Sequence, residues 1–523
     1  MEKLAKPIAA YPRLAALVFG VLAACGFPPL GLWPIGLAGV AGLVWLVGAS
    51  EGWRQAAWRG WLFGFAYFTV TNNWIATAFT FQEEMPVALG WAAVPLLSLY
   101  LALYPALATA LGKALGRKGA PLVFALAAAW VLAEWLRSWV FTGYAWGPLS
   151  LMLLGSFERP GAALMLPWLG TYALSGLTVA LGGGILLLAL ARKWIALGAL
   201  AFLLALAMHL PKPATPEGTL ALTLVQPNLK QEEIDDPRKF EEQFLTISAL
   251  SRPARDVERR LVLWPESGVP DYLEDGYPQR YYAKMTAAGD PAFARRRIGH
   301  VIGEGSLLLT GIVHLEIGEV EGRARAVGAY NSITAIGSDG TFKGTYAKAH
   351  LVPYGEYLPM RGLLEPLGLT RLVAGSIDFI PGPGPRTLDL GDYGRAGMQI
   401  CYEIVFSGET VDRADRPDFI FNPSNDGWFG SWGPPQHLAQ ARMRAIEEGL
   451  PVLRSTTTGI SAVIDAHGVV RSHIGRGLAE RIESHVPPAL APTWFARLGH
   501  WLTALWGALF LLLWAVAARL RNR

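Results

Sequence analysis

The chain has 523 residues, of which 52% are hydrophobic and 16% are charged, and its formal net charge is only +4. A soluble domain carries about 25% charged residues. Here the deficit is uneven, because residues 1–210 hold 18 of the 86 Asp, Glu, Lys and Arg residues and the remaining 313 residues hold 68. The composition excludes a purely soluble protein and predicts a membrane protein with a large water-exposed part. The small net charge gives no reason to expect nucleic acid as a partner.

Apolar segments recur through the first 210 residues, and about 20 such residues are needed to cross a bilayer. The uncharged stretch 14–50 is too long for one crossing, and its FPPLG sequence divides it because prolines end helices. We predict eight spans, at 12–27, 31–49, 57–80, 87–112, 120–140, 161–191, 194–210 and 498–518. The first could instead be a signal peptide, although no small-residue cleavage site precedes FPP and a second span follows at once.

Lysine and arginine in short loops mark the cytoplasmic side of a membrane protein. They precede the first predicted span and follow the second, fourth, sixth and eighth, whereas the alternate loops contain few. We therefore expect both termini in the cytoplasm and residues 211–495 outside. Glu134 and Arg137, at the end of the fifth span, are expected to reach the outer interface. Asn72 and Asn73 could meet a lipid head group or bond another helix.

Residues 211–495 contain short β-branched or aromatic runs closed by turn residues, which is typical of strands. The expected strands are 220–228, 260–267, 306–316, 330–340, 395–403, 417–426, 450–459 and 460–468. Helices are expected at 237–252 and 434–449. This alternation predicts a layered α/β domain whose strand ends carry the chemistry. The expected organisation is thus helices 1–7 in residues 1–210, a domain at 211–495 and a last helix in 496–523.

Three stretches of this domain hold candidate catalytic side chains. WPES (264–267) places Glu266 after an apolar strand, where a carboxylate is poorly solvated, although a turn carboxylate that caps an amide is an alternative. YAKAHLVPYGEYLP (346–359) holds Lys348 and Glu356, and a fixed cation can stabilise a developing oxyanion, although a lone loop lysine is usually solvated. ICYE (400–403) holds Cys401, which becomes a nucleophile if a base takes its proton but is otherwise a buried, inert cysteine.

Taken in order, these stretches are much more specific than any one alone. WPES, KAHLVPYGEY and ICYE, followed by NPSNDGWFG (422–430), resemble the Glu-Lys-Cys motifs of the nitrilase superfamily. With seven predicted spans before this domain and one after it, the whole chain resembles the bacterial apolipoprotein N-acyltransferase family. The resemblance is strong over 220–470 and looser in the helices, at GFAYFTVTNNW (64–74) and GYAWG (143–147). It implies an αββα sandwich.

The resemblance also implies roles for individual residues. Cys401 would be the nucleophile, Glu266 the general base and Lys348 the oxyanion stabiliser. Glu356 would support the lysine and the base. The backbone N–H of Tyr402 would be a second oxyanion donor.

Two further polar positions are interpreted in the same way. Tyr402 and Glu403, in CYE, would shape the site. His350 and His437 show no metal-ligand spacing that we recognise, and His350 is expected to be structural. No metal and no cofactor are expected.

The implied activity is acyl transfer from a phospholipid to the N-terminal α-amino group of the diacylglyceryl-cysteine of an apolipoprotein. A thioester on Cys401 would let the two lipids react in turn, provided that water is kept out. The implied partners are a phospholipid donor, a diacylated apolipoprotein acceptor and membrane lipid. The enzyme would act as a monomer in the inner membrane, with its catalytic domain on the periplasmic side.

Two loops bear on lipid contact. Residues 361–375 contain leucines that we interpret as a lid dipping into lipid, with a local packing cluster as the alternative: Leu363, Leu364, Leu367, Leu369 and Leu372. The loop PNLKQEEIDDP (227–237) lacks a tryptophan that the family often has there, which puts its part in lipid binding in doubt.

Two other functions remain open at this point. A membrane-tethered amidase would use the same three residues, but it would need neither eight spans nor a leucine-rich lid. A transporter would place charged or polar residues deep within several spans, and the sequence has almost none there.

Overall fold

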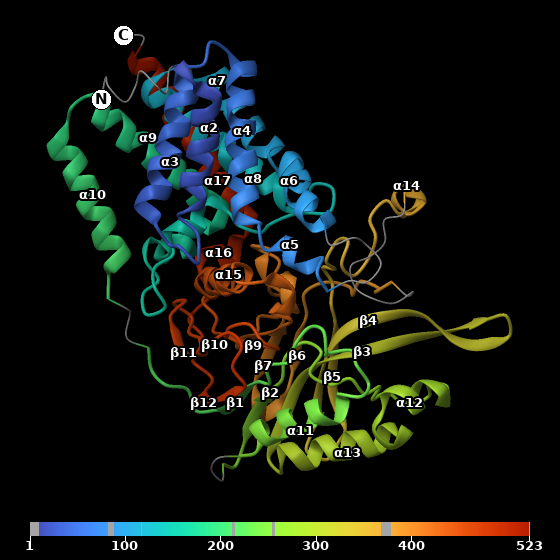
Figure 1. Cartoon of the computed structure of the whole chain (residues 1–523). Helices are drawn as coiled ribbons and strands as arrows, with labels where there is room; N and C mark the ends of the chain where they lie inside the picture. The colour runs from blue at the N-terminus through green and yellow to red at the C-terminus, as the bar shows by residue number, and fades with distance from the viewer. Residues whose placement is uncertain are drawn as a thin grey trace.

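The computed structural model describes residues 10–81, 88–116, 118–211, 215–253, 257–367 and 378–521. A bundle of helices lies at one end of the molecule and an α/β domain at the other (Figure 1). The last helix of the chain, α17, returns to the bundle and ends at its far side from the α/β domain (Figure 1).

The helices of the bundle come from both ends of the chain. They are α2 (Pro12–Ala24), α3 (Trp33–Gly48), α4 (Trp53–Thr71), α5 (Ile75–Ala78), α6 (Ala88–Leu101), α7 (Leu103–Leu115), α8 (Gly119–Trp139), α9 (Leu166–Leu190), α10 (Trp194–His209), α16 (Trp494–Leu498) and α17 (His500–Arg521). Every predicted span contains at least one of these helices. α2 and α3 are separate, and Pro28 and Pro29 lie between them as expected.

Four helical segments within the described ranges are long and apolar enough to cross a membrane: Ala88–Leu115, Gly119–Trp139, Ala162–Leu190 and His500–Arg521. Three shorter apolar helices are Pro12–Ala24, Trp33–Gly48 and Trp194–His209. These helices are consistent with the prediction of a membrane protein, and the count of eight spans stays a prediction.

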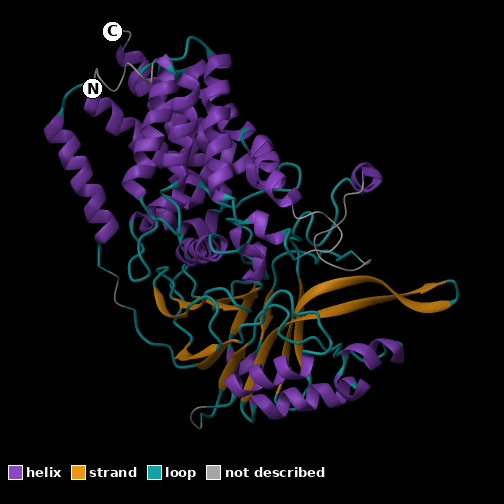
Figure 2. Cartoon of the chain, in the orientation of Figure 1, coloured by secondary structure: helices purple, strands orange, loops and turns teal. Residues whose placement is uncertain are grey.

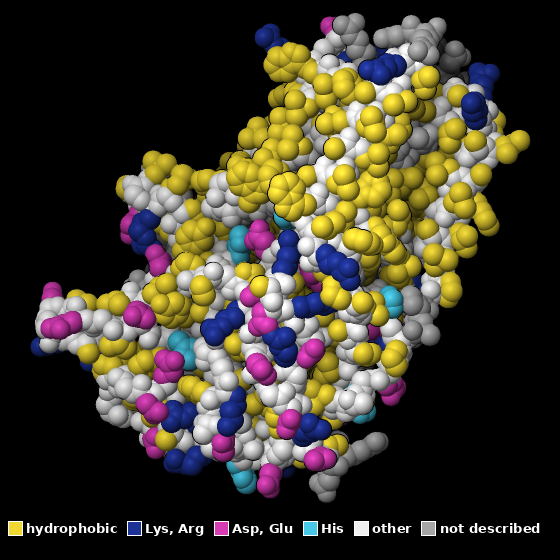
Figure 3. All heavy atoms as spheres, turned by 180° about the vertical axis from the view of Figure 1, so that it is seen from behind, with side chains coloured by type: hydrophobic (Ala, Val, Ile, Leu, Met, Phe, Trp, Pro, Cys, Tyr) yellow, Lys and Arg dark blue, Asp and Glu magenta, His cyan; other side chains and the backbone are white. Residues whose placement is uncertain are grey.

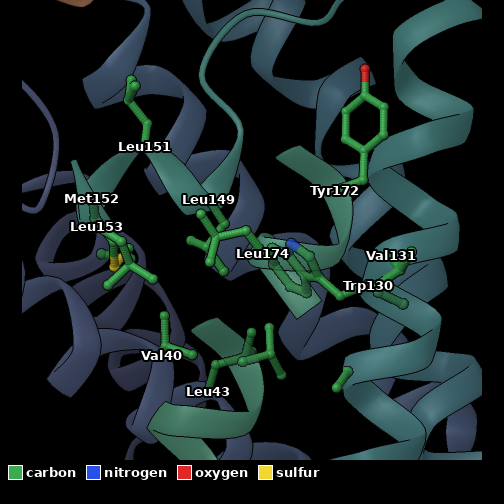
Figure 4. Packing of buried hydrophobic residues seen from close by; sticks show 14 of the residues in the cluster. Val40, Leu43, Trp130, Val131, Leu149, Leu151, Met152, Leu153, Tyr172 and Leu174 are labelled. Carbon is green, nitrogen blue, oxygen red and sulfur yellow. The ribbon is translucent and has the colours of Figure 1, made fainter. Parts of the chain in front are cut away.

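The bundle is held by close contact between apolar faces. Side chains of α3, α8 and α9 meet in its core, among them Val40, Trp130 and Leu174 (Figure 4). Glycines let the helices approach: a Cβ on Gly39 would lie 2.6 Å from the Phe19 carbonyl oxygen. Small residues serve this purpose in membranes because lipid gives apolar side chains no reason to leave it.

The α/β domain contains two six-stranded sheets (Figure 2). The first has the order β12 (Glu480–His485), β1 (Ala221–Gln226), β2 (Arg260–Leu263), β3 (Ser306–Val320), β4 (Arg323–Gly337) and β5 (Phe342–Ala347). The second has the order β11 (Val470–Ile474), β10 (Ser461–Ile464), β9 (Val452–Thr456), β8 (Phe419–Ser424), β7 (Arg395–Met398) and β6 (Thr387–Asp389). Within them β1, β2 and β3 are parallel, as are β7, β8 and β9.

Alternating side chains divide each strand between two cores, as the period of two in a strand requires. In β1, Leu222 and Leu224 pack between the sheets, whereas Val225 packs under α11 (Phe240–Ser251) and α13 (Pro291–Ile302). The second sheet is covered by α15 (Gly433–Glu448), which lies between it and the bundle (Figures 1 and 2). The resulting helix–sheet–sheet–helix order agrees with the expected αββα sandwich.

The individual elements agree less completely with the sequence. All eight expected strands and both expected helices have counterparts, but β5, β6, β11, β12 and α13 were not predicted. The strand expected at 395–403 was wrong at its end, because β7 stops at Met398 and Cys401 opens a short 3-10 helix, η6 (Cys401–Val405).

Candidate active site

The candidate residues gather where strands of the two sheets end. Glu266 follows β2 and Lys348 follows β5 directly. β5 is antiparallel to β4, which is antiparallel to β3, so β2 and β5 end at the same edge of the first sheet. Cys401 follows β7 of the second sheet, so the sandwich itself brings together residues that are up to 135 positions apart in the sequence (401 minus 266).

Lys348 lies between two carboxylates. Its Nζ donates to Glu356 Oε1 at 3.0 Å and lies 3.7 Å from Glu266 Oε1. The Lys348 side chain is 1% exposed. Burial alone would lower the pKa of Lys348, but Glu356 and then Glu266 outweigh it and raise the pKa above its usual value. The ammonium group is therefore a fixed positive charge, as an oxyanion stabiliser requires.

A half-buried amide holds the same two carboxylates. Asn331, on β4, donates from Nδ2 to Glu266 Oε1 at 2.7 Å and to Glu356 Oε1 at 2.8 Å. The other oxygen of Glu266 accepts the backbone N–H of Asn425 at 2.8 Å. Sequence reasoning missed Asn331, because β4 also carries Ser332 and Thr334 and its asparagine did not stand out.

Cys401 is 5% exposed and has a φ of +50°, in the left-handed region that a non-glycine residue rarely adopts. Burial raises the pKa of its thiol, Glu266 raises it further, and Lys348 opposes them without restoring the usual value. At neutral pH the resting group is therefore a thiol. It needs a base to become a nucleophile, and Glu266 is near enough to affect its titration.

Glu403 joins the loop after β5 to the loop after β7. Its Oε1 accepts from Tyr346 Oη at 2.8 Å and from the backbone N–H groups of Ala349 and His350 at 2.7 and 3.1 Å. Its Oε2 accepts the Ile400 N–H at 2.7 Å. Burial raises the pKa of Glu403 to about 7. This carboxylate therefore fixes the backbone beside both Lys348 and Cys401.

Aromatic packing surrounds Tyr402. Its ring lies edge-on to Phe406 with centroids 5.1 Å apart, and His350 stacks on Phe406 at 3.7 Å. Burial lowers the pKa of His350 to about 4, so the imidazole is neutral. This environment agrees with a structural His350.

Behind Cys401 lies a buried polar cluster that the sequence did not reveal. His437 Nε2 lies 3.0 Å from the Cys401 carbonyl oxygen, and its Nδ1 lies 2.9 Å from Asp426 Oδ1. Arg454 donates to both oxygens of Asp426 at 2.8 Å. Burial alone would raise the pKa of Asp426, but Arg454 and His437 outweigh burial and lower this pKa below its usual value. Through His437, Asp426 anchors the backbone of the candidate nucleophile.

The loop at 144–149, after α8 of the bundle, contacts α15 beside the candidate site. Arg137 donates to the carbonyl oxygens of Tyr144 and Trp146 at 2.8 and 2.7 Å, and Glu134 accepts the Leu149 N–H at 2.8 Å. Trp146 Nε1 in turn donates to Gln436 Oε1 on α15 at 2.8 Å.

The expectation that Glu134 and Arg137 reach the outer interface was therefore wrong. Both side chains are buried, and together they satisfy the backbone of a loop that contacts the α/β domain. Within the described residues, neither asparagine makes the expected bond to another helix: Asn72 accepts from Tyr144 Oη, in the loop after α8, at 2.9 Å, and Asn73 donates to the Val70 carbonyl of α4.

The two loops expected to contact lipid are described unequally. In the expected lid, the Leu363 side chain is 61% exposed, while the side chains of the other four leucines lie outside the described residues. The 227–237 loop borders the site, because Gln231 Oε1 accepts from Asn425 Nδ2 at 2.8 Å.

The sandwich and the buried Glu-Lys-Cys arrangement define a domain of the carbon-nitrogen hydrolase class. Residues 222–486 match the family model described as carbon-nitrogen hydrolase, and residues 19–184 match the apolipoprotein N-acyltransferase N-terminal domain.

Full-length relatives place the chain more narrowly. The apolipoprotein N-acyltransferase of Rhodopseudomonas palustris is 34% identical over 523 residues, which cover 95% of this chain and 94% of that protein. That of Bradyrhizobium diazoefficiens is 35% identical over 536 residues, covering 98% and 95%. The chain belongs to the apolipoprotein N-acyltransferase family and is an enzyme, an acyltransferase.

Two solved structures each match about half of the chain. An amidase from Nesterenkonia sp. AN1 is 15% identical, covers 53% of this chain and 94% of its own, and has a TM-score of 0.33. A nitrilase-superfamily protein of Saccharomyces cerevisiae is 18% identical, covers 53% and 93%, and has a TM-score of 0.35.

Proposed function

We propose that this enzyme transfers an acyl chain from a phospholipid to the N-terminal α-amino group of the diacylglyceryl-cysteine of an apolipoprotein, through a thioester on Cys401. The observation that carries the proposal is the buried charged cluster of Glu266, Lys348 and Glu356, which lies close enough to Cys401 to perturb its thiol. The cluster lies in the α/β domain, and the helices of the bundle include apolar ones long enough to cross a membrane. A nucleophile for lipid esters is thereby kept beside lipid.

In the first half-reaction, Glu266 takes the proton of the Cys401 thiol as the sulfur attacks the ester carbonyl of the phospholipid. The negative charge that develops on the carbonyl oxygen is stabilised by Lys348 and by the backbone N–H of Tyr402. The C–O bond breaks, the leaving oxygen takes the proton from Glu266, and a lysophospholipid departs.

In the second half-reaction, the amine of the acceptor attacks the thioester carbonyl. Glu266 accepts a proton from the attacking nitrogen, the C–S bond breaks, and the proton returns to the Cys401 sulfur. Atoms and charge balance over the cycle, with no cofactor. Three residues support the reaction without forming a covalent bond. Glu356 positions Lys348, Glu403 positions the flanking loops, and Tyr402 supplies the backbone N–H that binds the oxyanion.

We further propose the arrangement in the membrane: eight spans in a bacterial inner membrane, both termini cytoplasmic, and residues 211–495 periplasmic between helices 1–7 (1–210) and helix 8 (496–523). Figure 3 supports it, because hydrophobic side chains cover the bundle while charged ones gather on the α/β domain. At the other end of the bundle Arg59 donates to the Leu46 carbonyl and Lys113 to the Gly48 carbonyl, where the loop charges predict cytoplasm. The enzyme would act as a monomer.

The test is to incubate the purified full chain with phospholipid and a synthetic diacylated lipopeptide. We expect the peptide to gain the mass of one acyl chain on its amine, and the protein to carry the same acyl mass when the acceptor is omitted. Cys401→Ala should abolish both gains, whereas Cys25→Ala, the matched change at the other cysteine, should abolish neither. Ammonia release from simple amides without acylated peptide would instead identify an amidase.

A further inference from the structure

A cavity of about 690 Å³ lies away from the candidate active site, where the start of α9 meets α16 and the end of α15. Its lining is largely apolar and includes Met165, Trp168, Leu490 and Trp494. The volume falls within the range of about 300–1,000 Å³ that is typical of small-molecule sites. None of its lining residues is among those that bond Cys401, Glu266 or Lys348 in the described structure.

The cavity lies where the expected membrane–water interface would be, which suits a lipid. α9 and α17 belong to the helical segments long enough to span a membrane, and the cavity is at the N-terminal ends of both. Trp506 of α17 donates from Nε1 to the Trp168 carbonyl at 2.8 Å, which joins the two helices there. Trp168 and Trp494 are each 55% exposed. Half-exposed tryptophans at a helix end are typical of the membrane–water interface.

A cation stands beside this apolar space. Arg497, in the last turn of α16, lines the cavity and is exposed, and its guanidinium carbon lies 5.9 Å from the ring centroid of Trp494. Among the residues that the structure describes, no carboxylate forms an ion pair with Arg497. His467, on the same lining, offers a further polar group. An arginine above an apolar cavity complements a phosphate whose hydrocarbon chain fills the cavity, because guanidinium binds phosphate oxygens in pairs.

We propose that this cavity binds one membrane phospholipid, with its phosphate on Arg497 and an acyl chain between Trp168 and Trp494, at a site separate from the acyl-transfer centre. The site does not depend on the reaction at Cys401. Thr493, in the same lining just before α16, donates to the Glu447 carbonyl near the end of α15. A lipid in the cavity therefore packs against this contact and stabilises the junction of α15 and α16.

The connection continues toward the candidate nucleophile. The carboxylate of Glu447 accepts from Ser407 Oγ, two residues after η6, and from the backbone N–H of Thr171 on α9. Occupancy of the cavity therefore favours the observed placement of η6 against the bundle.

The test uses a diether phosphatidylglycerol with brominated chains, titrated into the purified full chain in detergent. This lipid has no ester to donate, and bromine quenches tryptophan fluorescence only at close range. We expect saturable quenching that is largely lost when Trp168→Phe and Trp494→Phe are combined. Arg497→Gln should weaken the apparent affinity about tenfold, the size of one charge-assisted hydrogen bond.

The matched control is Arg296→Gln, which removes an exposed positive charge from α13 in the outer helical layer. It should bind the lipid like the unaltered chain. Equal affinity of the Arg497→Gln protein, or equal weakening by both changes, would overturn the phosphate contact. Quenching that does not saturate, or that survives both Trp→Phe changes, would overturn the cavity as the site. Because the probe cannot donate an acyl chain, neither result depends on whether the proposed transfer reaction is correct.

Discussion

Replacing Asn331 by leucine tests whether a neutral amide positions the proposed base. The substitution keeps the approximate size of the side chain but removes the donations to Glu266 and Glu356, at 2.7 and 2.8 Å. A hydrogen bond to a charged group contributes about 1.5–3 kcal/mol. Losing two such bonds would lower the free energy of unfolding by at most about 6 kcal/mol. Because both bonds come from one amide and are not independent, we expect a loss of about 3 kcal/mol.

The effect on rate follows from geometry. Glu266 keeps the Asn425 N–H on its other oxygen, so the carboxylate stays in the site but is free to turn. A displacement of about 1 Å in a reacting group can cost about 100-fold in rate. We therefore expect kcat for lipopeptide acylation to fall about 100-fold while KM changes little.

The assay is acylated lipopeptide measured by mass spectrometry against time, with the melting temperature followed in parallel. The control is Thr334→Val on the same strand, which removes a buried hydrogen bond to His314 without touching the carboxylates. It should lower the melting temperature but leave kcat unchanged at temperatures where the protein is folded. Full activity of the Asn331→Leu enzyme would refute the idea that Asn331 positions Glu266.

Three more changes probe the charged groups. Lys348→Met should cost about 3–5 kcal/mol of stability by leaving buried carboxylates unpaired; adding Glu356→Gln should restore the melting temperature but not acyl transfer. The pKa of Glu403, about 7, predicts that kcat falls as the pH drops through 7, because a protonated carboxyl cannot accept from all four of its donors. The Glu403→Gln enzyme should be slower, and its kcat should no longer depend on pH near 7. If its kcat still falls there, the pH dependence belongs to another group. Arg137→Gln should lower both kcat and melting temperature by freeing the 144–149 loop, whereas Arg192→Gln, exposed beyond the end of α9, should change neither.

The sequence was most informative where a residue type is needed for a local physical reason. Apolar runs about 20 residues long predicted the helices of the bundle, and short β-branched or aromatic runs closed by turn residues predicted the central strands. The missed strands β6, β11 and β12 lie at the edges of the sheets and have exposed or half-exposed positions, so their apolar pattern is weak. Packing on a neighbouring strand determines such edges, and a single sequence does not show which strand that will be.

The same division applies to the candidate site. Motif order brought Glu266, Lys348 and Cys401 together before any geometry was known. Asn331 and His437 were missed as site residues, since their contacts depend on which backbone lies opposite them in the folded chain. Arg137 was misjudged for the same reason: a charge near the end of a span usually reaches water, but here a loop folds back and offers its carbonyl groups.

The charge balance of the site explains how a buried cysteine can react beside lipid. The proposed mechanism starts from two carboxylates and one ammonium group, which give the cluster one net negative charge, and ionising Cys401 into solvent would add a second negative charge at a buried place. That cost is consistent with the raised pKa of the thiol. Passing the proton to Glu266 instead moves the negative charge to sulfur and leaves the total unchanged. In the proposed mechanism the thiolate would therefore form only as Glu266 accepts its proton, with Lys348 paired throughout.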